Sequence, residues 1–325
     1  NTPNESYSKE YVRAFIDNDP IPGIEVEKQM MDLFSQMLPL EQVNTLLPQL
    51  VSDENRVVLL MLPDAEGFTI PTEQQLASML EAVEEEDLEP YKDTMREDPL
   101  IPNLPAPGSI KSQKTVEKWG ATEFTLSNGL KVVVKPTTFK DNEIKFLAVA
   151  NGGYSQLPDD QANTVIFMPY AMMKHGLGDY SNSDLNKYLQ GKQAQVNFSI
   201  GEYTRDMSGE TTVQDLPALM ELIYANFTEF NVTADEFAAA QNMFKGILAN
   251  QESTPDYAFG KLIKSTLTPA AAEQAISTAA IDAADRDATV SIVRQMLADA
   301  SDYTFFFVGN IDLDTFKPLM EQYLA

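Results

Sequence analysis

A segment without sustained hydrophobic periodicity divides this sequence into two patterned parts. The segment at 84–114, EEEDLEPYKDTMREDPLIPNLPAPGSIKSQK, is first acidic and then rich in proline. Because proline fixes φ and lacks an amide hydrogen, such a segment does not continue a helix or enter the middle of a sheet. The sequence therefore predicts a linker at 84–114, which joins a unit at 1–83 to a unit at 115–325.

The first unit is predicted to be mostly helical. Apolar residues recur at helical spacing through residues 1–50, with breaks at Pro20, Pro22 and Gly23. The run RVVLLML at 56–62 is continuously apolar, which favours a strand buried on both faces. We therefore expect helices followed by one buried strand and a further helix.

Polar residues mark the starts of helices in both units. Thr72 with Gln75, and Thr233 with Glu236, have the spacing of a capping box, in which two side chains satisfy the first free amides of a helix. Asp312 is placed to cap a last helix. These positions fix where three helices should begin.

The second unit is predicted to contain a sheet. ATEFTLSNGLKVVVKPT, which starts at Ala121, is expected to form a hairpin around the turn Asn128-Gly129. EIKFLAVANGG and DYTFFFVGN favour further strands, and QAQVNFSIGEYTRDMSGETT favours two strands around Gly201. Helical patterns lie between these strands. The expected fold class is α+β, with an antiparallel or mixed sheet packed with helices.

The two units share a repeated sequence pattern. SDENRVVLLML near the end of the first unit and SDYTFFFVGN near the end of the second both follow a helical pattern and precede a capped helix. This repeated pattern predicts a repeated domain, with a truncated copy at 1–83 and a complete copy at 115–325.

The chemistry open to the chain is limited by its single histidine, His175, and by the absence of cysteine. Most hydrolytic zinc sites and nucleophilic dyads need histidine or cysteine as ligand or base. One histidine cannot supply two ligands. An enzymatic interpretation must use carboxylates, or place the chemistry outside this chain.

The charge balance disfavours polyanionic partners. The chain holds 23 Lys and Arg residues against 49 Asp and Glu residues, a formal net charge of −26. Such a surface repels nucleic acid and anionic lipid, and it favours solubility or, alternatively, basic peptides and divalent cations. No apolar run approaches the roughly 20 residues of a membrane span. We expect neither a nucleic-acid partner nor a membrane span.

Several stretches in this order resemble the insulinase or pitrilysin type of zinc metallopeptidase, with the bacterial members the most similar. They are LSNGLKVVVKPT at 126–137, VANGG at 149–153, DLPALMELIYANFT at 215–228 and YTFFFVGNID at 303–312. The resemblance covers residues 115–325. No single motif is specific, and the order and spacing carry the resemblance.

The resemblance implies a four-domain clamshell whose halves enclose a chamber where peptides are cut. In such proteins the first domain binds zinc through H-x-x-E-H, and a helix further along supplies a third ligand, a glutamate. This chain would hold the end of domain two, the linker and domain three, and Asn1, which is not a methionine, would be a processed or truncated end. Its implied partners are a catalytic N-terminal half that holds the zinc, a C-terminal domain and peptide substrate. Bacterial relatives imply export to the periplasm, with the cytoplasm as the alternative.

The stretch FMPYAMMKHGLGDYS at 167–181 resembles the helix of the zinc motif and the turn after it. An alignment without gaps puts Phe167, Tyr170 and Ala171 where the family's catalytic domain has His, Glu and His. None of these three is a zinc ligand, and H-x-x-E-H occurs nowhere in the chain. The resemblance therefore implies a zinc-free counterpart of the catalytic helix, with no catalytic residue and no metal ligand in this chain.

Two residues are candidates for contact with substrate in the chamber. His175, beside Lys174, could bind a substrate carboxylate, or it could simply end a helix, where the dipole favours a cation. Arg205 lies on a predicted strand pair and could contact substrate backbone. For both residues a purely structural role is the alternative.

Three functions remain open. The first is a non-catalytic part of a clamshell zinc endopeptidase that encloses and holds peptides, with zinc only in the missing N-terminal domain. The second is a binding or assembly protein of the same fold without peptidase activity. The third is an unrelated hydrolase that uses paired carboxylates, for which the many acidic residues nominate no pair. An H-x-x-E-H sequence upstream of Asn1 would separate the first from the others.

Overall fold

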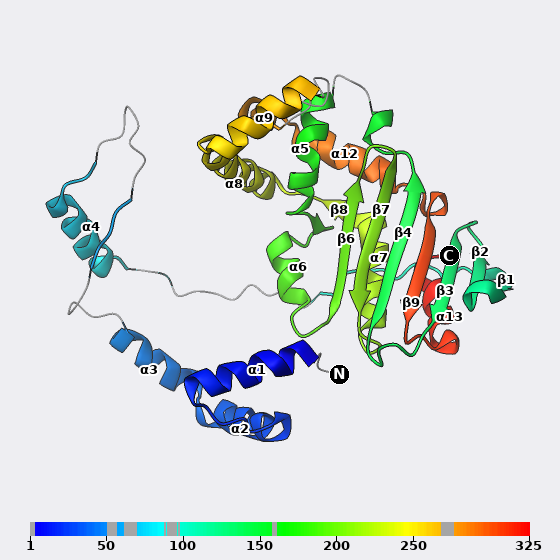
Figure 1. Ribbon diagram of the computed structural model, residues 1–325, viewed down its shortest axis with the longest axis horizontal. Coiled ribbons are helices and arrows are strands. Elements are labelled where there is room, and N and C mark those ends of the chain that lie inside the picture. Colours follow the sequence, from blue (N-terminus) through cyan, green and yellow to red (C-terminus); the bar gives the residue numbers. More distant parts are fainter. Residues whose placement is uncertain are drawn as a thin grey trace. The chain divides into compact units, whose positions relative to one another are not determined.

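The computed structural model describes residues 4–50, 57–61, 70–87, 89, 96, 98–157, 161–267 and 276–325 (Figure 1). The chain forms two units, Thr2–Asp93 and Thr94–Ala325. The boundary between them falls inside the segment predicted to be a linker.

The described part of Thr2–Asp93 is helical. Its helices are α1 (Asn4–Asp17), α2 (Ile24–Met37), α3 (Leu40–Leu50) and α4 (Glu73–Glu85). The predicted capping box of α4 is confirmed: the Gln75 amide donates to Thr72 Oγ1 at 3.3 Å, and the Thr72 amide donates to Gln75 Oε1 at 2.8 Å. Neither α1 nor α2 contains a buried residue.

The predicted buried strand at 56–62 is wrong where it can be checked. Residues 57–61 form no strand, and Val57, Leu59 and Met61 are all exposed. A strand needs neighbours that satisfy its backbone groups and cover its faces. The described residues of Thr2–Asp93 contain no strand with which this run can pair. Residues 56 and 62 lie outside the described ranges.

A seven-stranded mixed sheet forms the centre of Thr94–Ala325, which confirms the predicted fold class. The strand order is β1-β2-β3-β9-β4-β7-β6, and every neighbouring pair is antiparallel except the parallel pair of β3 and β9. The strands are β1 (Ile110–Val116), β2 (Ala121–Leu126), β3 (Lys131–Pro136), β4 (Ile144–Asn151), β6 (Ala194–Ile200), β7 (Thr204–Thr211) and β9 (Thr304–Gly309). The predicted hairpin is the β2–β3 pair, where Gly129 has a φ of 94°.

The linker was expected to extend to residue 114, but β1 begins at Ile110 and pairs with β2. The strand is an edge strand, and its middle residues are exposed on both faces. A strand of this kind shows no alternation of apolar and polar residues, so periodicity could not find it. Upstream of β1, Leu100 and Ile101 are buried against Thr94–Ala325. Leu88, Tyr91 and Met95 lie outside the described residues.

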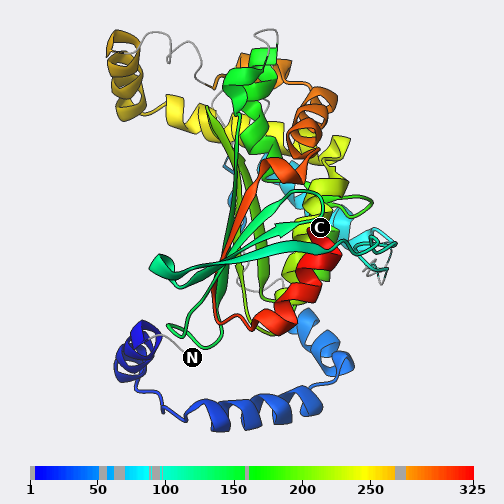
Figure 2. The ribbon, with the colours of Figure 1, turned by 90° about the vertical axis from the view of Figure 1, so that its right-hand side faces the viewer.

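Helices cover one face of the sheet (Figure 2). They are α7 (Leu216–Glu229), α12 (Arg286–Leu297) and α13 (Leu313–Tyr323). Phe305 of β9 contacts Phe227 of α7, with 6.0 Å between ring centroids, and Phe307 contacts Phe316 of α13 at 4.9 Å. The opposite face leaves Leu147 exposed. The buried core therefore lies between the sheet and these helices.

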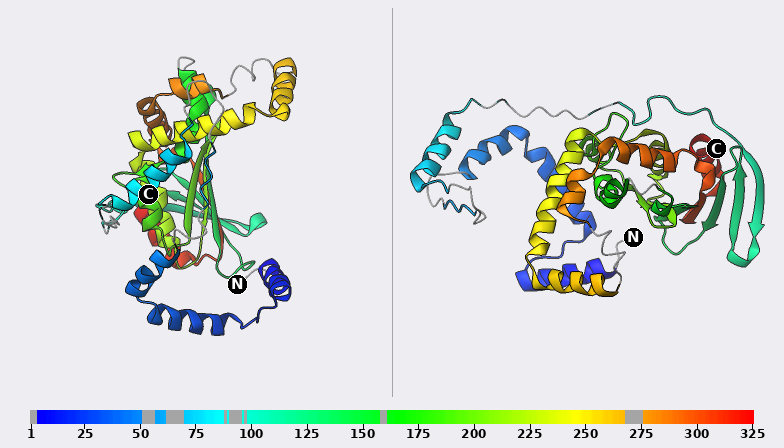
Figure 3. Two further views of the ribbon diagram at one scale, coloured as in Figure 1. Left: turned by 90° about the vertical axis from the view of Figure 1, so that its left-hand side faces the viewer. Right: turned by 90° about the horizontal axis from the view of Figure 1, so that it is seen from above.

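A second group of helices lies at one end of the sheet (Figures 1 and 3). It consists of α5 (Ala162–Met172), α8 (Ala234–Glu252), α9 (Pro255–Leu267) and α11 (Thr278–Ala283). The predicted caps Thr233 with Glu236 on α8, and Asp312 on α13, are confirmed. A short sheet of β5 (Gly176–Leu177) and β8 (Phe230–Asn231), together with α6 (Asn182–Tyr188), connects this group to the edge of the large sheet.

Candidate functional site

The α5 helix carries the three positions at which the resemblance would place zinc-binding and catalytic side chains. Phe167 and Ala171 are fully buried, and Tyr170 is half-buried. Helical spacing puts residues 167, 170 and 171 on one side of α5, so that they face the same neighbour. That neighbour is α8.

Aromatic rings fill the space between α5 and α8. Phe167 packs edge-on against Phe237, with ring centroids 5.5 Å apart and an interplanar angle of 86°. Tyr170 packs against Phe244 at 4.5 Å, and Phe167 also contacts Phe244 at 6.4 Å. Edge-to-face and tilted pairs of this kind add attraction beyond the area that they bury. We call Phe167, Tyr170, Phe237 and Phe244 the aromatic cluster.

These residues do not fit a zinc ion. Zinc in proteins takes nitrogen, thiolate or carboxylate ligands, and three side chains from two helices would have to converge on it. The aromatic cluster offers only the Tyr170 hydroxyl, and Ala171 offers a methyl group. Within the described ranges, no three His, Cys, Asp or Glu residues are grouped so that they could hold a metal ion.

His175 lies at the end of α5 and is held by three contacts. Its Nδ1 is 2.7 Å from the Met172 carbonyl oxygen, which assigns the ring proton of the neutral form to Nδ1. Its ring stacks on Phe230, with centroids 5.3 Å apart and planes at 16°. The Asn182 side-chain amide donates to its carbonyl oxygen at 3.0 Å. Burial lowers the pKa of His175 below 6.5, although the Met172 carbonyl, the Asn226 side chain and the charge of Glu236 raise it in part.

The lowered pKa predicts how His175 contributes to stability. As the pH falls, His175 of the unfolded chain takes up a proton before His175 of the folded chain does. The contribution of the neutral imidazole to the free energy of unfolding is therefore complete above pH 6.5, and it is lost as the pH falls through the folded pKa. We expect the free energy of unfolding of the wild type, relative to His175→Gln, to decrease as the pH is lowered below 6.5. Urea unfolding at several pH values measures this difference. An imidazole that titrates at or above pH 6.5 by NMR would contradict the prediction.

Arg205 is not free to reach a ligand. Its Nε donates to the Tyr303 hydroxyl at 3.1 Å, and its Nη2 donates to Asp302 at 2.7 Å. Its Nη1 donates to the carbonyl oxygens of Asn151 and Gly152 at 2.7 and 3.2 Å. The side chain joins the ends of β4, β7 and β9. Burial raises the pKa of Tyr303 to about 12, so its hydroxyl stays protonated and donates to the Met296 carbonyl at 3.1 Å.

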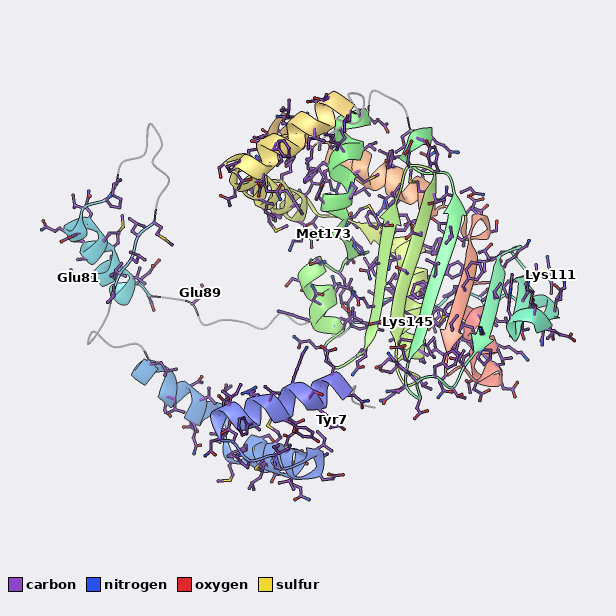
Figure 4. The ribbon with its side chains drawn as sticks, in the orientation of Figure 1. Tyr7, Glu81, Glu89, Lys111, Lys145 and Met173 are labelled. Atoms are coloured by element: carbon purple, nitrogen blue, oxygen red, sulfur yellow. The ribbon has the colours of Figure 1, made fainter. Side chains whose placement is uncertain are left out.

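A groove of about 730 Å³ runs along the free edge of β6. We call it the β6 groove. Its walls are β6, the end of α5, α6 and the inner side of α7, and Figure 1 shows α6 lying alongside β6. Figure 4 shows Met173, a lining residue that is 65% exposed, at the end of α5 near α6. Its lining includes His175, Met172, Val196, Phe198, Thr211 and Asn226.

The two residues predicted to contact substrate thus lie in different surroundings. His175 lines the β6 groove, whereas Arg205 does not and is bonded within the strand ends. The inner wall of the groove includes Thr211 and Asn226, which the sequence did not single out. Both are polar residues that are buried among apolar ones. Their burial depends on the fold, so no pattern in the sequence indicated it.

The chain has relatives among curated proteins. It is 24% identical over 324 residues to a protein of Arabidopsis thaliana named zinc protease PQQL-like, an alignment that covers 98% of this chain and 31% of the relative. It is 24% identical over 221 residues to the probable zinc protease PqqL of Escherichia coli, covering 66% of this chain and 23% of the relative. No family model matches the chain. The chain spans about a third of the length of the plant relative that it matches.

The structure agrees with these sequence comparisons. The crystal structure of the periplasmic protease PqqL from Escherichia coli superimposes with a TM-score of 0.60 at 17% identity, over 99% of this chain and 36% of that chain. The chain is thus similar to PqqL-type zinc proteases in sequence and in fold. The predicted resemblance to zinc metallopeptidases is confirmed, and the sheet with its helices is the fold that PqqL shares. In the described part of the chain, no helix has the length and apolar character needed to cross a membrane.

Proposed function

We propose that this chain is a non-catalytic part of a zinc endopeptidase and that it helps to enclose and hold peptide substrates. The zinc site would lie in another part of the same protein, N-terminal to this chain. Two findings support the proposal. The chain is homologous over nearly its whole length to proteins named zinc proteases, yet it spans only 31% of the plant relative. On its α5 helix, the positions that the resemblance assigns to the zinc motif hold Phe167, Tyr170 and Ala171, and the first two belong to the aromatic cluster.

The aromatic cluster is the observation that carries this proposal. A degenerate zinc site that had lost one ligand would still hold polar side chains around a polar cavity. Here Phe167 packs against Phe237 on α8, and the three positions on α5 contain no ligand. We therefore assign Phe167, Tyr170 and Ala171 to the positions of the zinc motif, as packing residues of a domain whose role is structural.

The domain organisation is part of the same proposal. Residues 1–83 would be the C-terminal part of a preceding α+β domain, 84–109 the linker, and 110–325 a complete domain without zinc. The boundary at 109/110 replaces the one expected from the sequence, because β1 begins at Ile110. Since the E. coli homologue is a periplasmic protease, we also propose that the whole protein is exported.

Zinc binding tests the proposal directly. The purified chain is incubated with zinc, desalted and analysed for metal by mass spectrometry. We expect far less than stoichiometric zinc, because the described residues offer no group of three ligands. One retained zinc ion per chain, lost in His175→Gln, would overturn the assignment of α5 as a zinc-free helix. Carbonic anhydrase, carried through the same steps, controls for loss of metal during desalting.

The coding sequence upstream of Asn1 supplies an independent test. The proposal expects an H-x-x-E-H motif there, followed by a glutamate further along. A protein whose remaining domains also lack this motif would be a binding or assembly protein of the same fold.

A further inference from the structure

The chain contains two Asn-Gly pairs, Asn128-Gly129 in the β2–β3 turn and Asn151-Gly152 at the end of β4. Asparagine is chemically labile, most of all before glycine, whose missing side chain lets the next amide nitrogen reach the asparagine Cγ. The attack forms an N–Cγ bond, releases the side-chain nitrogen as ammonia and closes a succinimide ring. Water then opens the ring at either carbonyl carbon, which gives aspartate or isoaspartate.

The Asn128 side chain is held at both of its polar atoms. Its Nδ2 donates to the Leu324 carbonyl oxygen at 2.8 Å, and its Oδ1 accepts from the Leu130 amide at 3.1 Å. The Gly129 amide donates to the Leu126 carbonyl oxygen at 3.0 Å. The side chain can turn towards the glycine nitrogen only if these hydrogen bonds break, so the folded structure protects this pair.

The Asn151 side chain is exposed, and it makes no hydrogen bond with any residue that the structure describes. Only the backbone restrains this pair, because the Gly152 amide donates to the Tyr203 carbonyl oxygen at 2.8 Å. Asn151 is the last residue of β4, and the ends of strands open more readily than their centres. Each opening of the strand end therefore frees both reacting groups at once.

The fold requires the glycine of this pair. Gly152 has a φ of 92°, a backbone conformation that residues with a side chain rarely adopt. A Cβ at this position would lie 2.6 Å from Gln156 Oε1 and 2.9 Å from Arg205 Nη1. The attacking residue is therefore set by the packing of the strand ends, whereas no described contact protects the side chain of Asn151.

Isoaspartate at position 151 would not fit these strand ends. It adds one CH₂ group to the main chain and leaves a free carboxylate. Arg205 Nη1 donates to the carbonyl oxygens of Asn151 and Gly152 at 2.7 and 3.2 Å, and the longer backbone changes the spacing of these two acceptors. The next residue, Gly153, lies so close to the β6–β7 turn that a Cβ there would be 2.0 Å from the Gly201 carbonyl oxygen. The lengthened loop would have to leave the turn.

We propose that Asn151 is a site of spontaneous modification, at which the folded protein deamidates at a rate set by the Arg205 hydrogen bonds. Arg205 keeps the end of β4 closed, and each opening of that end allows the Gly152 nitrogen to react. Isoaspartate then prevents the strand end from closing again, so the conversion is irreversible and loosens the molecule as it ages. This inference is independent of the proposed function.

The test follows both Asn-Gly pairs in the 325-residue chain. The purified chain is aged at mildly alkaline pH and digested at intervals. Mass spectrometry measures the mass increase of each peptide, and methylation by protein isoaspartyl methyltransferase identifies isoaspartate. We expect Asn151 to convert about ten-fold faster than Asn128 in the folded chain. In a chain unfolded by guanidinium chloride, the two pairs should convert at similar rates, because the hydrogen bonds that protect Asn128 are lost.

Three variants test the role of Arg205 and the consequence of the modification. Arg205→Met removes the donor to both carbonyl oxygens, and Asp302→Asn weakens the hold on Arg205 Nη2 but keeps the guanidinium. We expect them to accelerate conversion of Asn151 about ten-fold and about three-fold, with Asn128 unchanged. Asn151→Ser removes the site. Ageing should lower the thermal midpoint of the wild type and leave that of Asn151→Ser unchanged.

Conversion of Asn151 ahead of Asn128, accelerated by both changes around Arg205, supports the proposal. A folded chain in which Asn151 is as stable as Asn128 overturns it. Acceleration of both pairs to the same extent also overturns it, because the rate would then follow unfolding of the whole domain and not opening of the strand end. If circular dichroism shows that Arg205→Met does not fold, Asp302→Asn decides alone.

Discussion

Phe167→Ala is expected to lower the free energy of unfolding by about 3–5 kcal/mol. The side chain is fully buried and contacts Phe237 and Phe244 of α8 and Tyr170 of α5. Truncation removes these contacts and leaves a cavity between two helices that cannot close on it without moving apart from their other partners. Chemical denaturation, monitored by circular dichroism, measures the change.

Met173→Ala is the matched control for Phe167→Ala. It truncates a large apolar side chain at the end of the same helix, but that side chain is 65% exposed. We expect a change within about 0.5 kcal/mol. A cost for Phe167→Ala as small as that of the control would mean that the aromatic cluster does not hold α5 to α8. The packing role assigned to the zinc-motif positions would then be wrong.

Arg205→Met should be the second most damaging change, with an expected loss of about 2–4 kcal/mol in the free energy of unfolding. The substitution leaves the Asn151 carbonyl and the Tyr303 hydroxyl without their charged donor, close to a buried part of the core. Asp302 also loses its partner, but its side chain is 55% exposed and water can replace much of that attraction. Most of the loss therefore comes from the hydrogen bonds inside the protein.

Lys145→Met provides the matched control on the adjacent strand β4, and Figure 4 labels Lys145. Lys145 pairs with Glu210 at 3.4 Å, and both side chains are 57% exposed, so we expect a change within about 0.5 kcal/mol. The comparison also decides between two roles for Arg205. A substrate-binding arginine would leave stability intact and weaken peptide binding. Unchanged unfolding of Arg205→Met would contradict the structural role described above.

Features set by neighbours in the sequence were predictable. The hairpin at Asn128-Gly129 and the capping boxes of α4 and α8 depend on a few adjacent residues, whose turn and cap chemistry is the same in any fold. Strands β4 and β9 were found because their apolar patterns match burial in a sheet. The aromatic character of α5 at Phe167 was also readable, because it follows from residue type alone.

Features set by distant segments were not predictable. The apolar run at 57–61 reads as a buried strand, yet whether it becomes one depends on partners elsewhere. The polar strand β1 exists because β2 lies beside it. Asn226 belongs to an ordinary helix in the sequence, and Thr211 ends an ordinary strand. Only the packing of α7 against β6 and β7 buries them on the wall of a groove.

The position of β9 has a consequence for the order in which the seven-stranded sheet can be completed during synthesis. β3 and β4 follow each other in the chain but are separated in the sheet by β9, which follows the other six strands of the sheet in the chain. Until the ribosome has released residues 304–309, the hairpin β2–β3 and the trio β4–β7–β6 each present a bare inner edge. Nascent chains that stop short of β9 should therefore be candidates for chaperone capture or aggregation, even though six of the seven strands have already been made.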